Sequence, residues 1–192
     1  MTQTATATQA HPVAGVWDAD PAHSTVDFVA RHLMATKVRG HFAEWTATLT
    51  TGSHPGEAKV QATLQAASIT TGSEQRDGHL RSPDFFEVDK YPTLDFVSTK
   101  ISDLDADGHF TVTGDLTAHG VTAPVTLDVE FGGMLEQDPF GKTRISFSAT
   151  ADIDRETWGL KWNQPLAGGG FVVSKTIKTE IEVAFTLRVD AQ

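Results

Sequence analysis

Alternation of apolar and polar residues near the C-terminus constrains the fold more than any other feature of the chain. Mainly apolar residues occupy every second position from Ile177 to Val189, while Lys, Glu, Thr, Arg and one Ala stand between them. A half-buried β-strand has this period of two, and a helix does not. At about 3.3 Å per residue, a strand of this length spans about 43 Å. Tilted as barrel strands are, it would form a wall about 33 Å high.

The same alternation recurs earlier in the chain, in residues 26–30, 58–64, 110–116, 121–131 and 145–153. Turn-forming residues separate several of these segments, at 105–108, 118–120 and 138–141. We count about eight strands, joined mostly by short hairpins, which favours an antiparallel meander that closes on itself. The sequence therefore predicts an all-β fold, a single antiparallel eight-stranded barrel. A β-sandwich is the structural alternative.

Length and composition fit one domain. Residues 1–14 are rich in Thr and Ala and aperiodic, so we predict a flexible N-terminal tail there and a barrel domain over 15–192. The net charge of -10 and the pI of about 5.1 argue against nucleic acid or an anionic membrane as a partner. The sequence has no cysteine, no apolar run long enough for a membrane span and no secretory signal pattern at its start. We expect a cytoplasmic protein without stable membrane insertion.

One segment, residues 73–88, departs from the alternation. Ser73 is a suitable cap for a short helix, and Ser82 followed by Pro83 resembles a second cap with proline at the first helical position. We predict a helical excursion over one barrel mouth, with Phe85 and Phe86 turned inward.

From these residues the chain is identified as similar to the YceI-like family of lipocalin-like, polyisoprenoid-binding proteins. The matching blocks run in order through most of the chain: Asp20–Ser24 with Val26, Phe28 and His32; Val38–Phe42; Ser68–Thr71; Arg76–Asp77, His79–Ser82 and Asp84–Phe86; Tyr91–Pro92 and Phe96; Gly114–Thr117, Gly120–Thr122 and Pro124–Val125; Arg155 with Gly159–Leu160. The resemblance implies a non-enzymatic barrel with an amphipathic pocket for a long isoprenoid or a similar amphiphile. His119 stands where the family often has arginine, and Glu87 where it often has aspartate.

An eight-stranded barrel can either fill its interior with side chains or hold one slim ligand. Small residues share the inward positions with large rings, which would leave room between the rings: Ala30, Ala58, Ala62, Gly114, Ala123, Ala149 and Ala151. Alanines that merely ease a packed, tapered barrel are the alternative. Our candidate ligand-binding residues for the cavity are Phe28, His32, Phe42, Phe85, Phe86, Phe96, Phe110, Phe147, Trp158, Trp162 and Phe185.

Three basic residues of the excursion, Arg76, His79 and Arg81, are candidates for binding a ligand's head group, such as a phosphate or a quinone carbonyl. Pairing with neighbouring carboxylates to hold the loop in place is the alternative role. Trp158 and Trp162 would either line the entrance or plug the barrel end.

The sequence gives no support for catalysis or for a resident metal. His23, His32 and His41 lie on or beside early strands, yet no His-Glu-x-x-His spacing and no cysteine accompanies them. We therefore predict a non-enzymatic carrier, with no catalytic residues, no metal and no cofactor other than a bound isoprenoid lipid or isoprenoid quinone. A histidine-dependent metal-binding or enzymatic stress-response protein is the alternative. The partner is an amphiphilic small molecule, with no nucleic acid, and the chain is a monomer or a homodimer.

Overall fold

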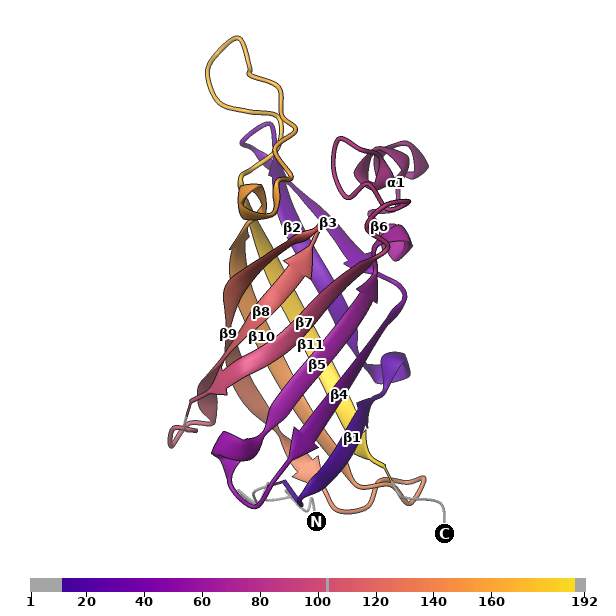
Figure 1. Cartoon of the computed structure of the whole chain (residues 1–192), viewed down its shortest axis with the longest axis vertical. Coiled ribbons are helices and arrows are strands. Elements are labelled where there is room, and N and C mark those ends of the chain that lie inside the picture. Colours follow the sequence, from indigo (N-terminus) through magenta and orange to yellow (C-terminus); the bar gives the residue numbers. More distant parts are fainter. Residues whose placement is uncertain (1–11, 103, 189–192) are drawn as a thin grey trace, which may run out of the picture.

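The computed structural model describes residues 12–102 and 104–188, which form a tall β-barrel with a small helical segment at one end (Figure 1). The strands are β1 (Gly15–Ala19), β2 (Thr25–His32), β3 (Thr36–Phe42), β4 (Trp45–Thr51), β5 (Lys59–Gln65), β6 (Ile69–Thr70), β7 (Thr93–Ile101), β8 (His109–Ala118), β9 (Val121–Leu135), β10 (Arg144–Asp154) and β11 (Thr176–Leu187). The helices are α1 (Glu74–Arg81) and the short 3-10 turns η1 (Pro21–His23), η2 (Pro55–Glu57), η3 (Ala66–Ser68) and η4 (Arg155–Trp158).

Eight strands close the barrel in the order β1, β4, β5, β7, β8, β9, β10 and β11, and β11 pairs back onto β1. The closing pair brings Trp17 opposite Leu187, and every neighbouring pair in the ring is antiparallel. The predicted antiparallel eight-stranded barrel is confirmed. A closed ring excludes the sandwich, because two packed sheets would leave edges unpaired.

Strands β2, β3 and β6 continue the wall at the end that carries α1. β11 pairs with β1 near its C-terminus and with β2 near its N-terminus, so β1 and β2 occupy one wall position. The chain bends between them at η1, where Pro21 begins the turn and the Asp20 side chain accepts a hydrogen bond from the Ala22 amide at 3.1 Å. Three of the eight wall positions are therefore made of two shorter strands each.

The alternation that predicted β11 corresponds to the two faces of the wall. Thr179, Ile181 and Phe185 face the barrel interior, whereas Lys178 and Glu182 are exposed on the outside. The strand ends at Leu187, and Val189 lies outside the described residues. The predicted turns at 105–108, 118–120 and 138–141 all connect strands, and His119 and Gly120 both have positive φ angles in the tight β8–β9 turn.

The excursion lies over one end of the barrel, as predicted, but it contains one helix and not two (Figure 1). α1 begins after Ser73, whose side chain makes no capping hydrogen bond. The prediction of a second helix after Ser82 is wrong. Here the Ser82 carbonyl accepts from the amides of Phe85 and Glu87, and Glu87 takes a φ of 46°, so the chain reverses instead of winding on.

None of the helices in the described part of the chain is both long and apolar enough to cross a membrane. Most of the predicted flexible tail, residues 1–11, lies outside the described residues, so its boundary stays a prediction.

Candidate ligand-binding cavity

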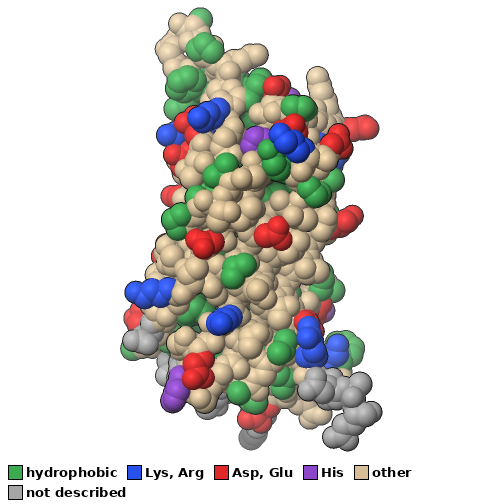
Figure 2. Space-filling model, viewed as in Figure 1, with side chains coloured by type: hydrophobic (Ala, Val, Ile, Leu, Met, Phe, Trp, Pro, Cys, Tyr) green, Lys and Arg blue, Asp and Glu red, His purple; other side chains and the backbone are tan. Residues whose placement is uncertain are grey.

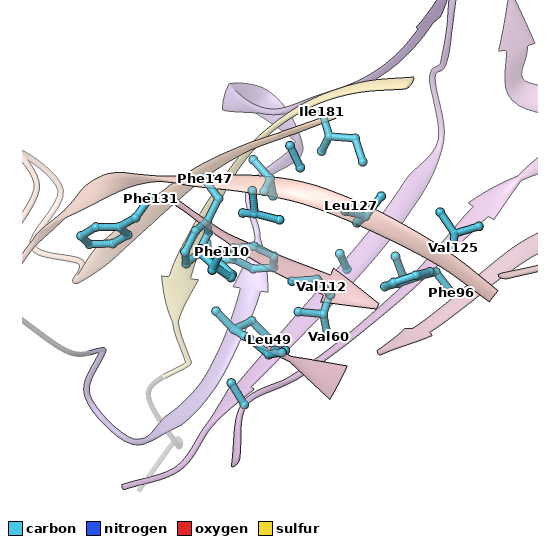
Figure 3. Close-up of a pocket in the computed structure, with 18 of the residues that line it drawn as sticks. Leu49, Val60, Phe96, Phe110, Val112, Val125, Leu127, Phe131, Phe147 and Ile181 are labelled. Atoms are coloured by element: carbon cyan, nitrogen blue, oxygen red, sulfur yellow. The ribbon is translucent and has the colours of Figure 1, made fainter. Parts of the chain in front are cut away.

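The barrel encloses a cavity of about 610 Å³. Apolar side chains from opposite walls point into it, from β4 and β5 on one side and from β8 to β11 on the other (Figure 3). The labelled side chains are Leu49, Val60, Phe96, Phe110, Val112, Val125, Leu127, Phe131, Phe147 and Ile181. Several of them, including Val60, Phe96 and Phe110, are only half-buried although they face inward, because they border empty space.

Small residues between the rings keep the middle of the barrel open. Ala47 and Ala62 lie opposite each other on β4 and β5, and Ala149 lines the facing wall. The rings that line the cavity are in ordinary edge-to-face contact along the wall, with centroids 6.0 Å apart for Phe110 and Phe147, and the empty volume of about 610 Å³ lies beside them. The fully packed interior that we kept as an alternative is therefore absent from this part of the barrel.

The end beneath α1 is closed by a hydrophobic cluster. Phe42, Ile69, Leu94 and Trp158 are buried there, and the Trp158 indole donates a hydrogen bond to the Leu116 carbonyl at 2.9 Å. Phe86 packs onto Phe42 with ring centroids 6.0 Å apart. We considered two roles for Trp158, lining the entrance or plugging the barrel end. In the structure it helps to plug the end.

The cavity reaches the surface at the opposite end, between the β4–β5 and β7–β8 loops. The mouth is lined by residues 51–54, 101–102 and 104–106; residue 103 lies outside the described part of the chain. Ser53, His54 and Leu104 are exposed there. Asp105 accepts hydrogen bonds from the amides of His109 at 2.8 Å and Asp107 at 2.9 Å. These bonds lower the pKa of Asp105, and the bond from the His109 amide has the largest effect. The mouth therefore carries an ionised carboxylate.

A second carboxylate stands beside the mouth. The hydroxyl and the amide of Ser53 both donate to Glu57, and these bonds lower its pKa. The charge at the mouth is therefore negative at neutral pH.

The structure brings six of the predicted cavity residues together in the lining: Phe28, Phe42, Phe96, Phe110, Phe147 and Phe185. The other five do not line it. Phe86 and Trp158 belong to the closing cluster, and Phe85 packs with Trp162 above it, their ring centroids 5.4 Å apart. His32 ends β2 and pairs with Val173. Alternation identifies the inward face of a strand, but four of these five residues lie outside the strands: Phe85 and Phe86 in the excursion, Trp158 in η4 and Trp162 in the loop after it.

The predicted head-group residues lie on the excursion, away from the cavity lining. Arg76 donates to the Thr71 hydroxyl at 2.6 Å and to its carbonyl at 3.1 Å, and Arg81 donates to the Ile69 carbonyl at 2.8 Å. His79 contacts Asp84 at 2.8 Å, and its ring packs edge-on against Trp162. These contacts correspond to the alternative of holding the loop in place, although only His79 pairs with a carboxylate, and the two arginines donate to backbone carbonyls and to the Thr71 hydroxyl.

Sequence reasoning missed the aliphatic part of the lining and the whole mouth. Val60, Leu127 and Ile181 stood at inward positions of the alternating segments, but only rings were selected as candidates. The mouth loops carry no motif, and pairing between strands distant in sequence decides which loops meet at one barrel end.

The histidines considered as metal ligands do not converge. His23, the last residue of η1, bonds to Asp20 at 2.9 Å, while His41 is exposed on β3. Across residues 12–102 and 104–188, no group of three or more His, Cys, Asp or Glu side chains is arranged to hold a metal ion.

A family model, a curated relative and a solved structure all match this chain over most of its length. A family model for the YceI-like domain matches residues 17–188. A UPF0312 protein of Staphylococcus aureus is 35% identical over 169 residues, which cover 88% of this chain and 95% of that protein. The crystal structure of a Campylobacter jejuni YceI protein is 30% identical and superposes with a TM-score of 0.70, over 83% of this chain and 90% of that one.

Two more distant structures share the fold alone. Burkholderia cenocepacia BcnA is 20% identical, with a TM-score of 0.74 over 86% of this chain and 98% of that one. A polyisoprenoid-binding domain from Saccharophagus degradans, implicated in plant cell wall breakdown, is 17% identical, with a TM-score of 0.67 over 90% and 98%.

Proposed function

The chain belongs to the YceI-like family, and on that premise we propose that it is a non-enzymatic binding protein that carries a long isoprenoid or quinone-like amphiphile inside the barrel. The cavity of about 610 Å³ is the observation that supports this most directly. Its lining is mainly aliphatic and aromatic, which suits an extended hydrocarbon and offers few groups for chemistry. The polyisoprenoid-binding domain of Saccharophagus degradans has the same fold, which supports the ligand class.

The volume sets the length of chain that fits. At about 30 Å³ for each water-sized group, the 610 Å³ cavity accommodates about 20 groups the size of a methylene. Burying that many carbons contributes about 16 kcal/mol at about 0.8 kcal/mol each, against an association cost of about 4–15 kcal/mol. Binding then depends on chain length and on the exclusion of water, more than on polar contacts.

We further propose that the polar end of the ligand lies at the mouth between the β4–β5 and β7–β8 loops. The carboxylates of Asp105 and Glu57 stand there, and both have lowered pKa values. An anionic diphosphate would be repelled by these charges, whereas a hydroxyl or a quinone carbonyl would not. The contacts of Arg76 and Arg81 with backbone carbonyls support a structural role for those two side chains.

Extraction of the purified protein with organic solvent, followed by mass spectrometry, tests the proposal. We expect a stoichiometric neutral lipid with an apolar chain of about 20 carbons, or uptake of added geranylgeraniol by ligand-free protein. Recovery of no lipid, together with no uptake of added isoprenoid alcohols or quinones, would contradict it.

A further inference from the structure

Two segments distant in sequence project together beyond the barrel at the end that carries α1 (Figure 1). One is the β2–β3 turn and the other is the loop between η4 and β11. The Leu33 amide donates to the Val172 carbonyl at 2.8 Å, and the Ser174 amide donates to the Arg31 carbonyl at 2.9 Å. Residues 31–37 and 161–174 therefore form one unit, which we call the tip.

The base of the tip is fixed by a buried arginine. Arg155 is 4% exposed, and it donates to the carbonyls of Ser174, at 3.0 Å, and Leu160. Burial lowers the pKa of its guanidinium, which also lies over the Phe85 ring, 5.9 Å from its centroid. Both ends of the longer loop are thereby held to the end of β10.

The tip presents large apolar side chains to solvent. Leu33 is 46% exposed, Met34 58% and Phe171 55%. Leu33 and Met34 have φ angles of 52° and 61°, in the left-handed region that bulky residues seldom occupy. Such strain persists where surrounding structure imposes it, and it is concentrated at functional sites. Figure 2 shows hydrophobic side chains on the segment that projects above the barrel.

The chain segments that carry these apolar side chains are basic, in a protein whose net charge is -10. Segments 28–43 and 157–179 contain no Asp or Glu, and they hold six of the 15 Lys and Arg residues: Arg31, Lys37, Arg39, Lys161, Lys175 and Lys178. Three of these pair with carboxylates of β10, η4 and β11: Arg39 and Lys178 with Glu180, and Lys175 with Asp154 and Glu156. Arg31, Lys37 and Lys161 form no salt bridge with a carboxylate in the described part of the chain.

We propose that the tip docks reversibly on a lipid bilayer that contains anionic lipids. Leu33, Met34 and Phe171 would enter the interface, while Arg31, Lys37 and Lys161 would contact the head groups. Exposed aromatic and aliphatic side chains rimmed by unpaired basic ones are the combination that binds such surfaces. A projecting, convex tip can enter a fluid interface without a matching pocket.

The net charge argued against an anionic membrane, but it averages over an uneven distribution. Glu136 and Asp138 lie at the opposite end of the barrel (Figure 1). The acidic residues at the same end as the tip, such as Glu74 of α1 and Glu156 of η4, lie outside residues 31–37 and 161–174. β11 alone is about 40 Å long at about 3.3 Å per residue, which at the tilt of barrel strands corresponds to about 30 Å along the axis. That distance is several times the screening length of about 8 Å at physiological salt, so the distant acidic groups contribute little repulsion.

Docking through the tip would leave the cavity mouth facing away from the bilayer, because the mouth lies at the other end of the barrel. Docking and ligand binding are therefore separable, and either proposal can fail without the other.

Sedimentation with vesicles of phosphatidylcholine, alone or mixed with phosphatidylglycerol, tests the docking. We expect binding to the mixed vesicles at low salt and release at high salt. The double variant Met34→Ser, Phe171→Ser should bind at least about tenfold more weakly, and Lys37→Ala about fivefold more weakly. Phe140→Ser is the matched control, because Phe140 is 80% exposed on the β9–β10 loop at the opposite end; this variant should bind like the unmodified protein.

Because the sequence has no cysteine, one introduced thiol can report insertion directly. An environment-sensitive fluorophore on Ala167→Cys should shift to the blue with mixed vesicles, whereas the same fluorophore on Phe140→Cys should not. Unchanged circular dichroism and Tm verify that the tip variants fold, and uptake of geranylgeraniol should also be unchanged. Absence of binding to mixed vesicles at low salt, or equal losses for the tip variant and the Phe140 control, would overturn the proposal, and a protein partner would then be the occupant to seek.

Discussion

Filling the cavity from one wall should shorten the ligand that the protein prefers. Ala62 lies on β5 between Ala47 of β4 and Phe96 of β7, and it lines the cavity. Ala62→Phe adds six ring carbons, which at about 30 Å³ each occupy about 180 Å³, nearly a third of the 610 Å³ available. The preferred chain should shorten from about 20 to about 14 carbons.

Six displaced carbons correspond to about 5 kcal/mol at about 0.8 kcal/mol each. The affinity of Ala62→Phe for geranylgeraniol should therefore fall by up to about three thousandfold, while its affinity for geraniol changes little. Competition of geraniol, farnesol and geranylgeraniol against a fluorescent apolar probe measures this preference. Gln61→Phe is the control, because it adds the same ring to the exposed outer face of β5. A folded Ala62→Phe variant that still prefers geranylgeraniol as the unmodified protein does would refute the reasoning.

Three further predictions concern the cavity, acid stability and metals. Phe147→Arg should abolish uptake of isoprenoid alcohols in a calorimetric titration, because it places an unpaired charge in the cavity wall; unchanged binding by a folded variant would count against the assigned lining. The hydrogen bond from the Lys142 amide lowers the pKa of Asp138 most, and hydrogen bonds from the Phe140 amide and the Arg144 side chain lower it further. Protonation therefore favours the unfolded chain, so Tm should fall as the pH drops below about 4. Asp138→Asn should weaken that dependence, and an equally steep decline in the variant would assign it to other groups. Protein treated with a chelator should contain less than stoichiometric metal by elemental analysis and still take up geranylgeraniol; loss of uptake that is restored by one metal would favour the metal-dependent alternative.

The barrel could be predicted from the sequence because each strand separates a hollow interior from solvent. Ile181 faces the cavity and Lys178 faces water, and this contrast repeats around most of the ring. Turn residues such as His119 and Gly120 marked the strand ends, since they accept positive φ angles. The bend at η1, where one wall position passes from β1 to β2, could not be predicted from the sequence, because Asp20 and Pro21 also fit an ordinary loop.

The site was only partly predictable, for reasons that lie in tertiary pairing. Phe110 and Phe86 were both assigned to the inward set, yet Phe110 lines the cavity and Phe86 packs in the closing cluster. Phe110 lies on β8, whereas Phe86 follows α1 and packs on Phe42, and local sequence does not encode how the excursion packs on the end of the barrel. Arg76 and Arg81 looked available for a head group because their partners, Thr71 and Ile69, offer backbone carbonyls, which are present at every residue.

The net charge of the chain indicated little about binding partners until the structure placed the charged residues. A net charge of -10 describes the whole chain, whereas the two segments of the tip contain Arg31, Lys37 and Lys161 together with exposed apolar side chains. Folding brings residues 31–37 against 161–174, and neither segment alone indicates the combination.

A crystal structure of the protein loaded with a bromine-tagged, long-chain isoprenoid analogue tests the central claim most directly. The account predicts continuous density along the barrel axis, between Phe110 and Val125, with the polar end near Ser53. Density for the analogue only on the outer surface, or a cavity that holds ordered water after loading, would contradict it.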